Sequence, residues 1–147
     1  MIVKVSTLLE TTADLAWRAV KRPATLLHVT RGLLGFPGLR RMPEEWRPGD
    51  RVRTRLVFFH VLPGWEHELG VAGVDEARHE IRSAEHGGPV RTWNHRIAVE
   101  PLSATRCRYT DEIDIRAGWL TPAVWLFAQV FYRYRQMRWR RLARSLS

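Results

Sequence analysis

Residues 92–116 read TWNHRIAVEPLSATRCRYTDEIDIR and contain two alternating segments separated by a break at residues 101–104. Alternation of apolar and polar side chains is typical of half-buried β-strands, and two such segments joined by a few residues predict an antiparallel hairpin. On the first strand His95 shares the apolar face, and on the second Asp111 does. The inner face of the first strand is therefore expected to contain an imidazole, and that of the second a carboxylate.

The turn lengths predict how these strands pair. If the turn between these two strands is centred near residue 103, His95 lies opposite Asp111. A shift of the strand register by two residues would keep both side chains inside and close together. The preceding turn, centred near residue 88, is expected to set Trp93 beside Ser83 and His95 beside Ile81. We therefore expect an imidazole and a carboxylate to meet in a mostly apolar interior.

The remaining segments complete an α+β fold. Thr12 is expected to cap a short helix, and Thr121 a long one with Pro122 at its first position. The long helix is the only element large enough to cover a curved antiparallel sheet of six to seven strands, which predicts an internal cavity between them. The expected strands are 2–9, 51–60, 65–74, 78–86, 90–100 and 105–116, with a weaker one near 38–42; the expected helices are 13–20, 24–31 and 122–144.

Composition places the chain among folded proteins. Its 147 residues fit one domain, 1–147, and 45% of them are hydrophobic. A single cysteine, Cys107, excludes an intramolecular disulfide and fits a reducing compartment. The apolar run 119–132 is too short to span a bilayer. We therefore expect a cytoplasmic protein with no membrane span.

The faces of the strands and of the long helix predict the residues around the cavity. Aromatic and aliphatic side chains would supply apolar contact, and the polar ones would anchor a polar group of a ligand. The expected ligand-binding residues are Thr54, Phe58, Leu69, Val71, Ile81, Ser83, Trp93, His95, Tyr109, Asp111, Phe127 and Phe131. Arg135 and Arg138 lie at the border of the helix face and are close enough to reach inward.

Several motifs resemble the SRPBCC superfamily, which includes START-type lipid-binding domains and polyketide cyclase-like proteins. The motifs are WRPGD at 46–50, GWEH at 64–67, TWNHRIAVEP at 92–101, YTDEIDIRAG at 109–118 and FYRYRQMRWRRLA at 131–143. They look most like bacterial cyclase/dehydrase-like members of unknown function. The resemblance implies a helix-grip (Bet v 1-like) fold and the binding or transport of a small hydrophobic ligand, lipid-like or aromatic and polyketide-like. It implies no cofactor and supplies no universal catalytic motif.

The roles of His95 and Asp111 stay open at this level. They would either brace the hairpin, orient a ligand, or act in a cyclase/dehydratase-type enzyme with His95 as base and Asp111 orienting it. His60 and His67 flank residues 63–64, but two histidines without a third ligand make a poor zinc site, so we expect no metal.

The charge of the chain leaves one further alternative. The formal charge of +9 would suit a basic module that contacts nucleic acid or anionic membrane. No nucleic-acid-binding motif accompanies the arginines, so we expect no nucleic acid partner. A homodimer is also left open.

Overall fold

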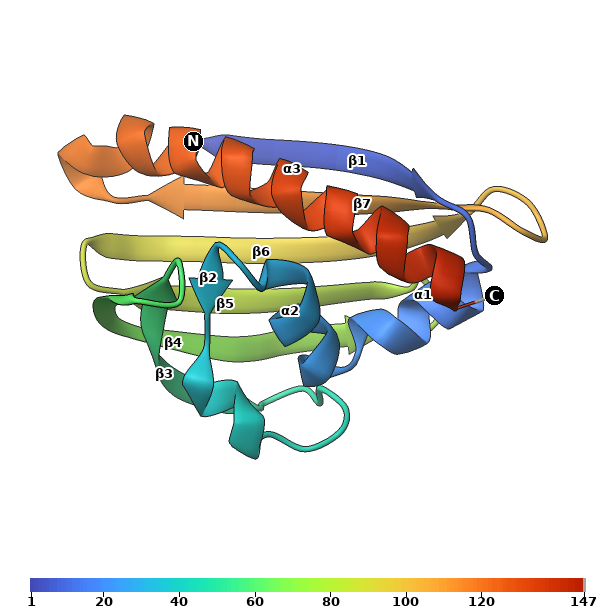
Figure 1. The fold of residues 1–147 in the computed structure, drawn as a ribbon, viewed down its shortest axis with the longest axis horizontal. Helices are drawn as coiled ribbons and strands as arrows, with labels where there is room; N and C mark the ends of the chain where they lie inside the picture. The colour runs from blue at the N-terminus through green and yellow to red at the C-terminus, as the bar shows by residue number, and fades with distance from the viewer. Residues whose placement is uncertain (147) are drawn as a thin grey trace.

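A curved antiparallel sheet packed against a long C-terminal helix makes up the fold (Figure 1). The computed structural model describes residues 1–146. Its seven strands are ordered β1-β7-β6-β5-β4-β3-β2, and α3 runs along one face of the sheet, packed mainly on β1 and β7. The predicted α+β helix-grip fold is confirmed. The strands are Ile2–Leu9, Leu34–Gly35, Arg51–Phe58, Leu62–Asp75, Glu80–Gly87, Val90–Pro101 and Cys107–Arg116 (β1–β7), and the helices are Ala13–Val20, Pro23–Thr30 and Thr121–Ser145 (α1–α3).

The helices α1 and α3 begin in different ways. The Thr12 hydroxyl accepts a hydrogen bond from the Leu15 amide at 3.2 Å, so the predicted cap of α1 is confirmed. The predicted cap of α3 is wrong, because Thr121 is the first residue of that helix and follows Leu120 at the N-cap. Its hydroxyl instead accepts from the Ala117 amide at 2.9 Å and so fixes the chain that enters the helix.

The segment between α2 and β3 differs from the prediction. The weak strand expected near 38–42 is wrong: Pro37–Arg41 form a short 3-10 helix, and β2 lies just before it. The Gly38 amide donates to the Thr54 hydroxyl at 2.9 Å, and a Cβ at position 38 would lie only 2.8 Å from Cβ of Thr54. Because of this close approach, the segment packs on β3 as a 3-10 helix and does not add a strand to the sheet.

The turn before β4 comes earlier than residues 63–64. Phe59 and His60 have positive φ angles of 53° and 66° and form the turn, whereas Pro63 and Gly64 lie within β4. This early part of β4 pairs only with β3, since pairing to β5 begins at His67. This part of β4 has no hydrogen-bonded neighbour on its other side, and such edge segments tolerate a proline.

Both central hairpins are shifted from the expected register. His95 lies opposite Ile113 on β7 and opposite Ser83 on β5, so each turn is centred one residue later than predicted. The shift moves every pair by two positions, and the inner faces are therefore unchanged. Asp111 now lies opposite Ile97, diagonal to His95.

The buried face of α3 is made mostly of aromatic and small side chains. Phe131, Tyr132 and Trp139 are almost fully buried, whereas Tyr134 and Leu142 are only half-buried. The buried face also includes Arg135 and Gln136, which a hydrophobic pattern by itself cannot identify. Within residues 1–146, each helix is too short or too polar to cross a membrane.

Candidate ligand-binding cavity

A cavity of about 420 Å³ lies between the sheet, α2 and α3. Its wall is mostly aliphatic and aromatic, and its volume falls within the usual range for small-molecule pockets, about 300–1,000 Å³. Nine of the twelve predicted ligand-binding residues line it. They are Phe58, Leu69, Val71, Ile81, Ser83, Trp93, His95, Phe127 and Phe131.

Within residues 1–146, the other three predicted residues are not part of the cavity lining. Thr54 is buried, but its hydroxyl is occupied by the Gly38 amide of the 3-10 helix. Tyr109 and Asp111 are fully buried beneath α3, where they contact the helix instead of open space. Alternation correctly placed all three inside, but it does not say which inner residues the helices cover.

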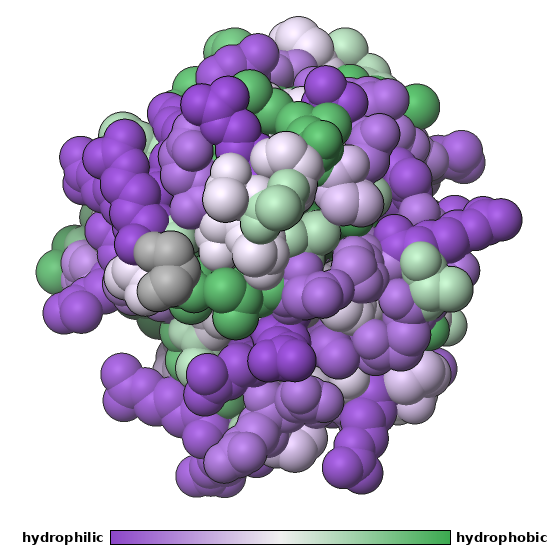
Figure 2. All heavy atoms as spheres, turned by 90° about the vertical axis from the view of Figure 1, so that its right-hand side faces the viewer, coloured by the Kyte–Doolittle hydropathy of each residue, from purple (hydrophilic) through white to green (hydrophobic). Residues whose placement is uncertain are grey.

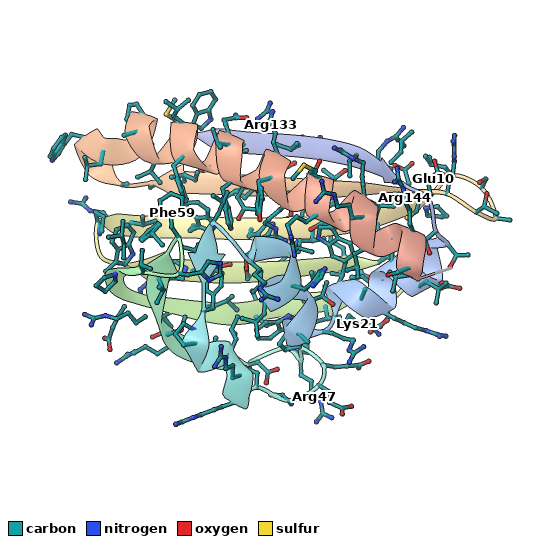
Figure 3. The ribbon with its side chains drawn as sticks, in the orientation of Figure 1. Glu10, Lys21, Arg47, Phe59, Arg133 and Arg144 are labelled. Atoms are coloured by element: carbon teal, nitrogen blue, oxygen red, sulfur yellow. The ribbon has the colours of Figure 1, made fainter. Side chains whose placement is uncertain are left out.

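The cavity reaches the surface at one end of the molecule. Pro89, in the turn before β6, and Ala123, in the first turn of α3, both line the cavity and are both exposed. Figure 1 shows this turn, the start of α3 and the β3–β4 turn at the same end of the molecule. Trp119 is 88% exposed just before α3, and Phe59 lies at this end as well (Figure 3). Two large, exposed apolar side chains therefore lie at the end of the molecule where the cavity opens.

The predicted meeting of His95 and Asp111 is confirmed, within a larger group that we call the Asp111 cluster: His95, Tyr109, Asp111, Arg135 and Gln136. His95 Nε2 lies 2.8 Å from Asp111 Oδ1, and the Tyr109 hydroxyl donates to the same oxygen at 3.0 Å. Gln136 Nε2 donates to Oδ2 at 3.2 Å, and Arg135 Nη2 lies 3.7 Å from Oδ1. Both carboxylate oxygens are therefore occupied.

The electrostatics of the Asp111 cluster favour a charged carboxylate. Burial raises the pKa of Asp111, but the positive charge of Arg135 and the hydrogen bonds from His95 and Gln136 outweigh it and leave the pKa lowered. Burial raises the pKa of Tyr109, so its hydroxyl stays protonated and donates. Asp111 is therefore an anion held inside the protein by its partners.

The Asp111 cluster also joins three parts of the fold. His95 comes from β6, Asp111 from β7 and Gln136 from α3. The side chain of Gln136 also donates to the Val5 carbonyl of β1 at 2.6 Å. This geometry fits the brace predicted as one of the roles of the pair, because removing any member would leave a buried polar group without a partner.

A second group, the Glu85 cluster, comprises His67, Ser83 and Glu85. His67 Nε2 lies 2.8 Å from Glu85 Oε2, and the Ser83 hydroxyl donates to Glu85 Oε1 at 2.7 Å. All three residues line the cavity. Burial raises the pKa of Glu85, but the hydrogen bond and charge of His67, with smaller contributions from His95 and Ser83, leave it lowered.

Sequence reasoning did not propose the Glu85 cluster, although alternation contained the signal. Glu85 has the same parity as Ser83 and Ile81, and His67 has the same parity as Leu69. Both were therefore on inner faces. His60, by contrast, lies exposed in the β3–β4 turn, and among residues 1–146 no three His, Cys, Asp or Glu side chains gather in a way that could hold a metal ion.

Four buried polar atoms in the cavity wall have no hydrogen-bond partner among the described residues. They belong to residues that line the cavity: Trp65 Nε1, His67 Nδ1, Arg135 Nε and Trp139 Nε1. An unpaired buried polar group costs roughly 1–3 kcal/mol. Each of these four lining residues therefore keeps one buried polar atom without a protein partner.

Aromatic rings form much of the remaining wall. Trp93 Nε1 donates to the Tyr132 hydroxyl at 3.0 Å, which fixes two rings from opposite sides of the cavity. The Phe127 ring stacks on Phe131 with centroids 5.7 Å apart and meets the edge of Phe58 at 6.0 Å. These ring contacts hold the lining side chains in defined positions.

The arginine-rich end of α3 lies at the other end of the molecule from the cavity entrance. Mostly hydrophilic side chains cover this end (Figure 2). Arg138 donates to the His28 carbonyl at 2.9 Å, so it docks on α2 and does not reach the cavity as Arg135 does. Arg140 donates to the Thr7 hydroxyl on β1 at 2.9 Å. Two of these arginines therefore attach the end of the helix to its neighbours.

The architecture is the START-like helix-grip fold, as comparison with solved structures shows. A START superfamily protein from Mycobacterium smegmatis has a TM-score of 0.73 and 11% identity, over 99% of both chains. Norcoclaurine synthase from Thalictrum flavum, in complex with dopamine and hydroxybenzaldehyde, has a TM-score of 0.68 and 15% identity, over 99% of this chain and 87% of that one. The Zhui aromatase/cyclase from Streptomyces sp. R1128 has a TM-score of 0.67 and 14% identity, over 98% and 93%. Identities this low establish the fold alone.

Within that class, the sequence itself assigns the chain to one family. Residues 15–146 match the family described as "Domain of unknown function (DUF8410)", and the chain belongs to it. No curated protein matches the sequence.

Proposed function

We propose that this protein binds a small, largely apolar molecule, lipid-like or aromatic and polyketide-like, in the cavity between the sheet and α3. The observation that supports this proposal is the cavity itself, which has a volume of about 420 Å³ and a mostly apolar wall with a few buried polar groups. Burial of apolar ligand surface supplies the affinity, and the polar groups supply orientation. The exposed apolar residues at the entrance, such as Trp119, suit the passage of an apolar molecule.

A wall substitution that fills the cavity tests this proposal. Val71 is buried and lines the cavity, so the larger ring in Val71→Phe would occupy space that the ligand needs. The substitution is expected to weaken binding of the apolar dye phenylnaphthylamine by about tenfold or more. Val130→Phe makes the same change at a residue of α3 that is 61% exposed and does not line the cavity, and it should bind the dye as the unchanged protein does. Dye fluorescence measures both, and thermal unfolding confirms that both variants are folded.

The result that contradicts the proposal is equal dye binding by the Val71→Phe variant and the unchanged protein. Native mass spectrometry of protein purified from its own host gives an independent check, since a retained lipid or ring compound would appear as added mass. The ring compounds named with the norcoclaurine synthase structure suggest dopamine and hydroxybenzaldehyde as early probes.

A cyclase- or dehydratase-type enzyme is a second candidate, favoured by two histidines, His67 and His95, that line the cavity and are each bonded to a buried carboxylate. In each pair the carboxylate orients the ring and would raise its basicity. If His95 is a base, His95→Ala should lower turnover of a polyketide-like substrate by about 10²-fold or more. Unchanged turnover in that variant would exclude His95 as the base.

A further inference from the structure

The charges of the chain are divided unevenly between its helices and its sheet. Residues 15–43 and 115–147 contain 13 of the 24 basic side chains and none of the 15 acidic ones. These two segments include most of α1 and all of α2 and α3, whereas most of the sheet comes from the rest of the chain. The net charge of +9 is therefore an excess on the helices, because the rest of the chain has more acidic than basic side chains.

Much of the basic charge on the outer face of the sheet is neutralised by carboxylates. Arg51 Nη1 and Arg53 Nη2 lie 3.8 and 3.3 Å from the two carboxylate oxygens of Glu68. Arg108 Nη1 lies 3.1 Å from Glu100 Oε2. An anionic partner would therefore find few uncompensated cations on these strands.

The exposed arginines of α3 are not neutralised in this way. Arg133 Nη1 donates to the Gln129 carbonyl of the same helix at 3.0 Å. Arg138 and Arg140 donate to uncharged oxygen atoms of neighbouring elements. Within residues 1–146, Arg141 forms no ion pair with a carboxylate. The positive charge of this helix is therefore available to an anionic partner.

The helix α2 extends the cationic surface beside α3. The two helices pack together, and the His28 carbonyl of α2 accepts from Arg138. Burial, followed by the positive charges of Arg138 and Arg31, lowers the pKa of His28. Because α2 itself contains no acidic residue, no carboxylate of its own offsets these charges.

The outer side of α3 changes from apolar to basic along the helix. Its exposed positions recur at intervals that place them on one side of the helix. In the first half they are apolar, and Leu126 and Val130 are each 61% exposed. In the second half they are mostly arginines: Arg133, Arg140, Arg141 and Arg144 (Figure 3).

An exposed tryptophan extends the apolar half of this surface. Trp119 lies in the 3-10 turn Gly118–Leu120 just before α3 and is 88% exposed. Tryptophan is enriched where a membrane meets water, because its ring is apolar and its N–H is polar. A bilayer with anionic lipids offers an apolar layer next to a layer of negative charge, which is the arrangement that complements this surface.

We propose that the outer side of α3 docks on an anionic lipid membrane. Trp119, Leu126 and Val130 enter the boundary between head groups and acyl chains, and the arginines of the second half contact anionic head groups. Nucleic acid would match the arginines but not the exposed Leu126 and Val130. Docking goes beyond the proposed ligand binding and does not depend on it, although it would bring the cavity entrance to the membrane surface.

Vesicle sedimentation tests the docking. In low-salt buffer the protein should bind vesicles made of equal parts of phosphatidylcholine and phosphatidylglycerol, and added salt should weaken this binding because it screens exposed charges. Vesicles of phosphatidylcholine alone should bind at least about tenfold more weakly, because they lack the negative surface charge.

A pair of charge variants locates the binding surface. Arg133→Gln combined with Arg141→Gln should lower the affinity for anionic vesicles by about tenfold or more, since each arginine near such a surface contributes about fivefold. Arg51→Gln combined with Arg53→Gln gives the same net charge but changes the outer face of the sheet, so this control should bind as the unchanged protein does.

A pair of apolar variants tests insertion. Leu126→Ser should lower the affinity for anionic vesicles by about fivefold, because less apolar surface is buried. Leu102→Ser is the matched control, since Leu102 is 44% exposed in the β6–β7 turn at the other end of the molecule, and it should bind the vesicles unchanged. Thermal unfolding checks that all variants are folded.

Several outcomes would overturn the docking. They are no binding to anionic vesicles, equal binding to both kinds of vesicle, and equal losses in the two double variants, which would show that only the overall charge matters. Equal effects of Leu126→Ser and Leu102→Ser would exclude insertion. Binding to a short DNA duplex without binding to vesicles would assign the surface to nucleic acid instead.

Dye binding keeps docking and ligand binding separate. Within residues 1–146, none of the substituted residues lines the cavity, so each variant should bind phenylnaphthylamine in the absence of vesicles as the unchanged protein does. Dye binding without vesicle binding would overturn docking alone, and vesicle binding without dye binding would overturn the proposed function alone. If a variant does not fold, the comparison of the two kinds of vesicle on the unchanged protein still decides.

Discussion

The two imidazole–carboxylate clusters have the same central bond but different surroundings. Each has a histidine Nε2 lying 2.8 Å from a buried carboxylate. Asp111 has partners from three secondary-structure elements and lies against a buried arginine, whereas among residues 1–146 Glu85 has only His67 and Ser83 within hydrogen-bond distance. The same pair of residue types therefore serves as a brace under α3 in one place and as part of the open cavity wall in the other.

The largest expected effect is on the brace. Asp111→Asn leaves the buried Arg135 without its counter-ion, so we expect the free energy of unfolding to fall by about 3–5 kcal/mol, measured by urea denaturation. The adjacent Glu112→Gln changes a carboxylate on the outer face of the same strand and should alter stability by less than about 0.5 kcal/mol. A loss for Asp111→Asn as small as that of the control would show that the cluster is not a brace.

Acid should weaken both clusters, because each contains a buried, ionised carboxylate. The pKa values of Asp111 and Glu85 are lowered in the folded protein, so the unfolded chain takes up protons first as the pH falls. The stability from both carboxylates is present above the ordinary carboxyl pKa of about 4 and is lost as the pH falls through the lower folded-state values. Urea titrations at several pH values should show that Asp111→Asn and Glu85→Gln each flatten this acid dependence; a variant that keeps the full dependence would show that its carboxylate does not contribute to it.

A smaller effect is expected from Glu85→Gln. The substitution removes a buried charge-assisted hydrogen bond but leaves no buried arginine uncompensated, so stability should fall by about 1–3 kcal/mol. Urea denaturation beside Asp111→Asn measures the difference directly. If Glu85→Gln were the more destabilising of the two, the Glu85 cluster would be the main structural element.

The smallest effect is expected from Ser83→Ala. It removes the hydroxyl that donates to Glu85 Oε1 at 2.7 Å and should cost about 0.5–1.5 kcal/mol in the free energy of unfolding. Ser6→Ala is a suitable control, because the Ser6 hydroxyl also bonds one side chain, Thr110, but at the exposed surface. Equal losses for the two serines would mean that Ser83 does not contribute through a buried bond.

Much of the fold follows from short-range patterns. β1 and α1 have the predicted bounds, and the other predicted strands and helices shift by a few residues at most, apart from the segment before β3. Alternation placed His95 and Asp111 on inner faces correctly because the side-chain period of a strand is fixed by its backbone geometry. The same rule also places His67 and Glu85 on inner faces, but their meeting depends on the register of β4 against β5, in which Glu85 lies opposite Leu69.

The registers and the coverage of the sheet were not predictable in this way. A turn that closes one residue later moves each cross-strand pair by two positions, and no local pattern distinguishes the two closures. The 3-10 helix that covers Thr54 depends on the approach of Gly38 to a strand sixteen residues further along the chain. Contacts of this kind join segments far apart in sequence.

By itself, then, the sequence determined which residues face inward and that a long helix must cover them, because both follow from periodicity and hydrophobicity along the chain. Only the tertiary structure decided that Asp111 is enclosed beneath α3 while Glu85 faces the cavity, because that depends on which side chains of the helix lie over each strand. The surroundings of a buried carboxylate are set by residues that lie far away in sequence but close in space. The sequence contains these residues, but it does not show which of them meet.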